Sequence, residues 1–121
     1  MQAQVPGPVI QQGYRFAMRL EVVTTPGLFP SGVALTAHVK AKRTDAAPLV
    51  VLSTGTGELV RVSDTVLDVV IPASATADFP VTKDATVIMD FVRTDTDEPQ
   101  PLAFSVQVPV ILPVTPASAL A

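Results

Sequence analysis

Proline is the residue that most constrains what this chain can fold into. Its 12 prolines punctuate the 121 residues throughout, and a proline inside a helix removes a hydrogen bond and clashes with the preceding turn. Short strands joined by turns tolerate such spacing. The hydrophobic residues, 48% of the chain, are mainly valine, alanine, leucine and isoleucine, and β-branched side chains pack well on a pleated surface. The chain is therefore predicted to be all-β.

Alternation of apolar and polar residues marks the predicted strands. In the clearest run, residues 14–22, every second residue is apolar and arginine, alanine or glutamate stands between. A period of two is typical of a strand with one buried and one solvated face. Further strands are predicted at residues 33–41, 49–52, 58–62, 65–71, 85–93 and 101–111.

The segments between these runs predict turns. Gly55 and Gly57 indicate a hairpin loop from which residues 58–62 return. Residues 72–79 favour one short helical turn, because Pro72 suits a first helical position and alanines follow it. About seven short strands predict a β-sandwich, with a small barrel as the alternative. We expect an extended N-terminal arm (1–12), one sandwich domain (13–112) and a C-terminal tail (113–121).

Residues that form catalytic or metal sites are scarce. The chain has no cysteine, which excludes disulfides, cysteine-ligated metals and thiol catalysis. Its one histidine, His38, stands on the polar side of an alternating run and is expected to face solvent. Asp95, Asp97 and Glu98 share one turn, but they lack the glycine and the spacing of a calcium loop. Neither a cofactor nor an enzymatic activity is predicted.

The charge pattern argues against nucleic-acid and membrane partners. The net charge is -3, so there is no basic footprint for phosphate backbones or anionic lipid. Lys40, Lys42 and Arg43 are interpreted as a solubilising strand end rather than a nucleic-acid site. We expect no secretion signal, because no basic segment and apolar run open the sequence.

The last predicted strand carries Pro109, which cannot donate to a sheet ladder, so this strand is expected to be an edge or to be bulged there. Its neighbours are apolar, and an apolar edge aggregates unless it is covered. A partner subunit would cover it; the alternative is that the domain covers it itself. The residues predicted to contact a partner are Val5, Val9, Ile10, Val108, Val110, Ile111, Leu112 and Val114.

Four short strings along residues 13–115 carry a family resemblance. They are Gly-Tyr-Arg-Phe at 13–16, the Val-x-Ala-x-Val-type strand at 33–39, Pro-Ala-Ser-Ala-Thr at 72–76, and Asp-Phe-Val-Arg-Thr-Asp at 90–95. In this order they resemble the small immunoglobulin-like β-sandwich modules of tailed-bacteriophage virions. The resemblance implies a structural virion protein made in the host cytoplasm, acting as a homo-oligomer in contact with other virion proteins.

Two other functions are weighed against this one. A receptor- or glycan-binding module would use loops at one end of the sandwich, with residues 26–32, 53–57 and 94–100 as candidates. An enzyme would need two carboxylates that converge in a pocket, and no spacing of acids in the sequence indicates such a pair.

Overall fold

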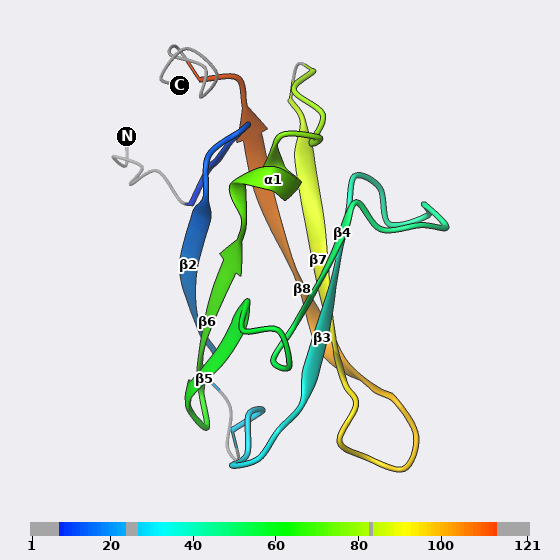
Figure 1. Cartoon of the computed structure of the whole chain (residues 1–121). Helices are drawn as coiled ribbons and strands as arrows, with labels where there is room; N and C mark the ends of the chain where they lie inside the picture. The colour runs from blue at the N-terminus through cyan, green and yellow to red at the C-terminus, as the bar shows by residue number, and fades with distance from the viewer. Residues whose placement is uncertain (1–7, 24–26, 83, 114–121) are drawn as a thin grey trace, which may run out of the picture.

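The computed structural model describes residues 8–23, 27–82 and 84–113, which form eight strands and one short helix (Figure 1). In chain order these are β1 (Ile10–Gln11), β2 (Phe16–Glu21), β3 (Leu35–Lys40), β4 (Val50–Ser53), β5 (Leu59–Ser63), β6 (Val66–Ile71), α1 (Ala73–Thr76), β7 (Thr86–Arg93) and β8 (Gln100–Ile111). Within these ranges, no helix is long and apolar enough to cross a membrane.

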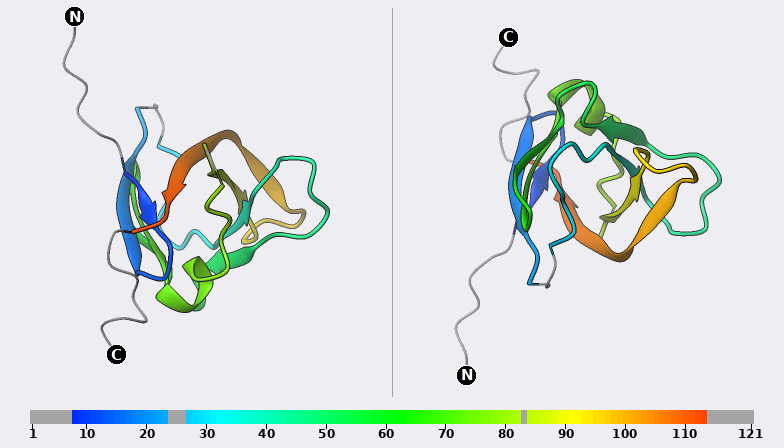
Figure 2. Two further views of the ribbon diagram at one scale, coloured as in Figure 1. Left: turned by 90° about the horizontal axis from the view of Figure 1, so that it is seen from above. Right: turned by 90° about the horizontal axis from the view of Figure 1, so that it is seen from below.

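The strands form two sheets that pack face to face. One sheet has five strands in the order β1-β8-β7-β3-β4, and the other has three in the order β2-β6-β5. All neighbours are antiparallel except β1, which runs parallel to β8. Figure 2, which views the strands end-on, shows the two layers. The order corresponds to the B-E-D and G-F-C sheets of an immunoglobulin-like sandwich. The predicted all-β sandwich is confirmed, with eight strands.

The alternating sequence explains which side chains fill the space between the sheets. In β3 and β7 every second residue is buried, and the side chains between them lie on the outer face. A buried Leu, Val or Phe side chain contributes about 1.5–3 kcal/mol relative to exposure. The largest side chains that are fully buried are Phe29, Phe79, Phe91, Ile10, Leu35, Leu52, Leu59, Leu67, Ile71 and Met89.

The short helix α1 fastens the loop before β2 to the sandwich. Pro72 precedes the helix with extended backbone angles, and Thr76 at its end is fully buried. The Thr76 hydroxyl donates to the Tyr14 carbonyl at 2.8 Å and accepts the Gly13 N–H at 3.1 Å. The helical turn predicted near residues 72–79 is confirmed. The role of Thr76 as a buried polar anchor was not predicted.

Two predictions about the chain path are wrong. The sequence predicts an extended arm at residues 10–11, but they form β1, and Ile10 is completely buried. The expected hairpin around residues 53–57 does not form, because β4 lies in the five-stranded sheet and β5 in the three-stranded sheet. The glycine-rich segment is instead the crossing between the two sheets. The predicted tail beyond Pro113 lies outside the described residues.

Candidate functional site

Strand β8 has an edge that is open to a partner over part of its length. Strand β1 pairs with β8 only at Val110 and Ile111. The Val110 N–H donates to the Ala85 carbonyl next to β7. Because backbone groups alternate along an antiparallel strand, Ser105 and Gln107 turn their N–H and C=O groups away from β7. Over the residues that precede its pairing with β1, β8 is therefore an edge strand. An edge strand is one of the two outcomes predicted for the strand that carries Pro109.

Two prolines, Pro101 and Pro109, and a bulge limit how much of this edge can pair. Pro109 pairs with Thr86 and follows the same alternation, so its nitrogen points away from β7 and the ladder loses no bond. Between Ser105 and Pro101 the pairing with β7 shifts, so residues 102–104 are bulged. Bulges and prolines are common protections of sheet edges. Only the short stretch from Ser105 to Gln107 remains free to form a regular ladder.

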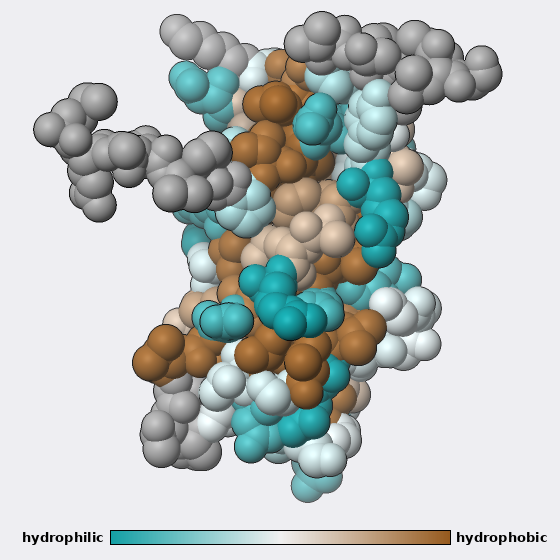
Figure 3. Space-filling view, turned by 90° about the vertical axis from the view of Figure 1, so that its left-hand side faces the viewer, coloured by the Kyte–Doolittle hydropathy of each residue, from teal (hydrophilic) through white to brown (hydrophobic). Residues whose placement is uncertain are grey.

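An apolar groove lies beside this stretch, between β8 and the end of β2. Its volume is about 460 Å³. Figure 3, which views the molecule from the β2 side, shows apolar residues across much of this face. Phe104 is held at the groove by Phe91, with ring centroids 5.5 Å apart. The residues that line the groove are Leu20, Glu21, Val22, Val23, Leu28, Ala103, Phe104, Ser105 and Val106.

Charge distinguishes β8 from β2 and β5. All twelve residues of β8 are uncharged. Strand β2 carries Arg19, whose guanidinium lies 2.8 Å from Asp68 on β6, and this hydrogen bond lowers the pKa of the Asp68 carboxyl. Strand β5 carries Arg61, which pairs with Asp64. Charged side chains commonly prevent pairing at a sheet edge. The exposed edge of β8 has no charged side chain to do so.

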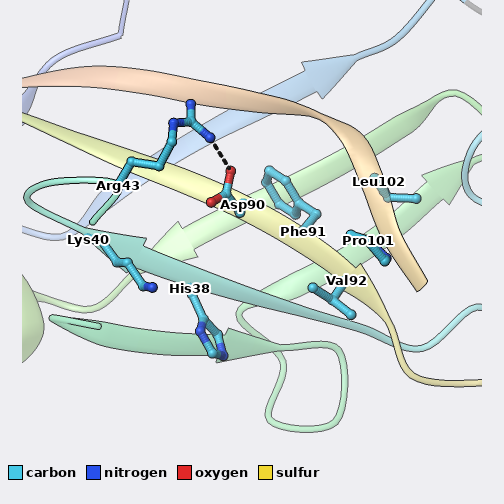
Figure 4. Close-up of a pocket in the computed structure, with 8 residues that line it drawn as sticks. All are labelled: His38, Lys40, Arg43, Asp90, Phe91, Val92, Pro101 and Leu102. Carbon is cyan, nitrogen blue, oxygen red and sulfur yellow. Dashed lines mark ion pairs between the residues drawn. The ribbon is translucent and has the colours of Figure 1, made fainter. Parts of the chain in front are cut away.

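A second hollow lies on the outer face of the five-stranded sheet (Figure 4). His38 and Lys40 reach it from β3, and Asp90 from β7. Arg43 lies 3.6 Å from the Asp90 carboxylate and donates to the Ser105 hydroxyl at 2.9 Å. His38 is exposed, as predicted for a strand histidine facing solvent. The hollow therefore has mixed charge, and its one arginine is engaged by protein groups.

The acidic turn after β7 is held by an ion pair. Arg93 donates to both carboxylate oxygens of Asp95, at 3.1 and 2.7 Å. This hydrogen bonding lowers the pKa of Asp95 to about 2. Asp97 and Glu98 stay exposed. In the described part of the chain, no group of three His, Asp or Glu side chains is arranged to hold a metal ion.

The predicted interface residues divide into core and surface. Ile10, Val108 and Val110 are at most 4% exposed, so their side chains belong to the domain's own core and cannot contact a partner. Val9 is half-buried, while Ile111 and Leu112 are 46% and 63% exposed. Val5 and Val114 lie outside the described residues. The sequence did not predict the groove, because no local pattern brings β2 and β8 together.

Comparison with protein-family models, with curated proteins and with solved structures finds no match. A function for this chain therefore rests on its own residues and surfaces.

Proposed function

We propose that this chain is a structural, non-enzymatic component of a tailed-bacteriophage virion, and that it assembles with copies of itself through a sheet edge and its terminal arms. The observation that carries the proposal is the uncharged free edge of β8 beside an apolar groove. In native proteins, an exposed sheet edge and an apolar surface of this kind are commonly covered by a partner or by another part of the chain. The resemblance of residues 13–115 to small virion modules supports the assignment to a tailed-phage particle.

The residues at the edge suit assembly better than catalysis. Backbone groups of Ser105 and Gln107 provide directional hydrogen bonds, as in strand addition. Phe104, Val106 and Leu20 provide apolar surface next to them. Prolines and a bulge stop the pairing at both ends, which favours one defined neighbour over open-ended aggregation.

The molar mass of the purified chain, measured by light scattering over a range of concentrations, tests the proposal. We expect a concentration-dependent oligomer that Gln107→Lys weakens, because an exposed lysine deters pairing at an edge. Val51→Lys is the matched control, since Val51 is exposed on β4 at the opposite edge of the same sheet. A chain that stays monomeric at every concentration, alone and with particle proteins, would contradict self-assembly.

A second candidate is a receptor- or glycan-binding module, and the hollow around His38, Lys40 and Arg43 is the observation that favours it. Those side chains offer several donors to an acidic sugar. Binding to a glycan array that Arg43→Ala abolishes, and that Gln107→Lys leaves unchanged, would support this function over assembly.

A further inference from the structure

Residues 1–7 have a pattern that matches the groove. Met1, Ala3 and Val5 alternate with Gln2 and Gln4, and the segment carries no charged side chain. In an extended strand this pattern gives one apolar face and one polar face. An uncharged, one-sided strand is the kind of segment that an apolar groove beside a free sheet edge can accept.

The parallel register of β1 with β8 would not place the apolar residues of this segment in the groove. Ile10 pairs with Val110 in a parallel ladder, and paired residues share a face. Continued backwards, the same register sets Gln4 beside Phe104, which lines the groove, and Val5 beside Ser105. The polar residues would then face the apolar groove and the apolar residues would face away from it.

The hydrogen-bond alternation of β1 leads to the same conclusion. Gln12 donates its N–H to the Ile111 carbonyl, so even-numbered residues of this segment turn their nitrogens toward β8. Pro8 stands in that alternation and has no N–H to donate, which explains why β1 begins only at Ile10. Pro6 stands in the same alternation, two residues earlier. Each of these prolines would remove one hydrogen bond from a parallel ladder with β8.

A segment from another copy is not bound to this register. Running antiparallel to β8, it can set Gln4 opposite Ser105 and Gln2 opposite Gln107, whose backbone groups point away from β7 and have no partner among the described residues. Ala3 then lies on the same face as Val106, and Val5 on the same face as Phe104, toward the groove.

In this arrangement Pro6 falls opposite the bulge at residues 102–104, where β7 and β8 themselves form no regular ladder. We propose that the groove between β2 and β8 receives residues 1–7 of a second copy of this chain, added as a strand antiparallel to β8. The inference rests on the proposed self-assembly and names the segment that performs it.

Paired cysteines test the register directly, because the chain has no cysteine of its own. The double variant Gln4→Cys/Ser105→Cys sets two thiols opposite each other in the proposed arrangement, within the spacing that a disulfide spans. After mild oxidation we expect a disulfide-linked dimer on a non-reducing gel. The two single variants show how much dimer forms from like cysteines alone.

The control Val5→Cys/Ser105→Cys reports the chain's own parallel register. We expect it to form cross-linked dimer several-fold more slowly than the first pair. A cross-linked monomer in either double variant would mean that the segment occupies its own groove and would overturn the exchange. Equal cross-linking of the two pairs would overturn the antiparallel register.

Removing residues 1–7 separates this inference from the proposed function. We expect the shortened chain to lose self-association while its far-UV circular dichroism is unchanged. Should it fail to fold, Val5→Asp in the full chain gives the same test, because it places a charge in the groove. An oligomer that withstands both changes overturns the inference and leaves self-assembly standing. A full chain that never associates overturns both.

Discussion

The two strands that flank the groove, β2 and β8, keep their free edges apart from other chains in different ways. Strand β2 carries Arg19 and Glu21, and Arg19 is paired across the sheet with Asp68. Strand β8 has no charge and relies on Pro101, Pro109 and a bulge. Charged side chains oppose pairing because a second chain would desolvate them, whereas prolines and bulges block pairing only where they stand. The difference leaves one short, selective opening on β8.

The largest effect is expected from the ring pair that supports the β8 side. Phe91 is fully buried on β7 and stacks against Phe104 at the groove. Phe91→Ala removes a large core side chain and leaves a cavity, which costs about 3–5 kcal/mol. Urea unfolding measures the loss. Phe104→Ala, at a half-buried ring, is expected to cost less; the reverse ranking would contradict this reading of the groove.

The next effect concerns the β2 side, where Thr76 fastens the loop before the strand. Thr76→Val keeps the shape of the side chain but removes the hydroxyl that donates to the Tyr14 carbonyl and is the acceptor of the Gly13 N–H. An unsatisfied buried group costs about 1–3 kcal/mol. Thermal unfolding should show the loss, and Thr76→Ser should recover much of it. A Thr76→Val protein as stable as the parent would show that the hydroxyl is dispensable.

A smaller effect on stability, but a visible one on association, is expected when β2 loses its charges. Arg19→Ser with Glu21→Ser makes this edge as uncharged as β8. The pair with Asp68 is exposed to solvent and contributes little to stability, so folding should change little. Light scattering should detect new, less specific association, since β2 lacks a proline and a bulge. Unchanged scattering would show that charge does not protect this edge.

The smallest effect is the pH dependence of the turn that leads into β8. Hydrogen bonding to Arg93 lowers the pKa of Asp95 to about 2, below the value of about 3.9 for an unfolded aspartate. This pair therefore contributes stability above about pH 4, and the contribution is lost as the pH falls toward 2. Asp95→Asn should remove this part of the acid sensitivity in unfolding curves from pH 5 to pH 2. An unaltered acid profile would contradict the assignment.

Local periodicity was enough to predict most strands of this fold. The alternating runs became β2, β3, β6, β7 and β8, and Pro72 with its alanines became α1. Features that depend on distant partners were missed. Strand β1 has a single buried residue, Ile10, in a polar stretch, and two residues show no period. Gly55 and Gly57 indicate a turn. They do not indicate which sheet β5 joins, because that depends on the side chains against which Leu59 is buried.

The candidate site was only partly predictable for the same reason. Pro109 indicated an edge strand, because a missing N–H is a property of one residue. Val108 and Val110 were assigned to a partner contact because they are apolar, and burial inside the domain explains them equally well. The groove needs β2 and β8 side by side, which only the arrangement of the two sheets determines.

The parallel pairing of β1 with β8 gives the molecule a polarity. The chain enters the sandwich at Ile10 and leaves it beyond Ile111, and these two positions are neighbours in one sheet. The hairpin loop between β7 and β8 lies at the opposite end of the long strands (Figure 1). Attachment of the sandwich next to Ile10 or next to Ile111 would therefore orient it in the same way, with that loop pointing outward.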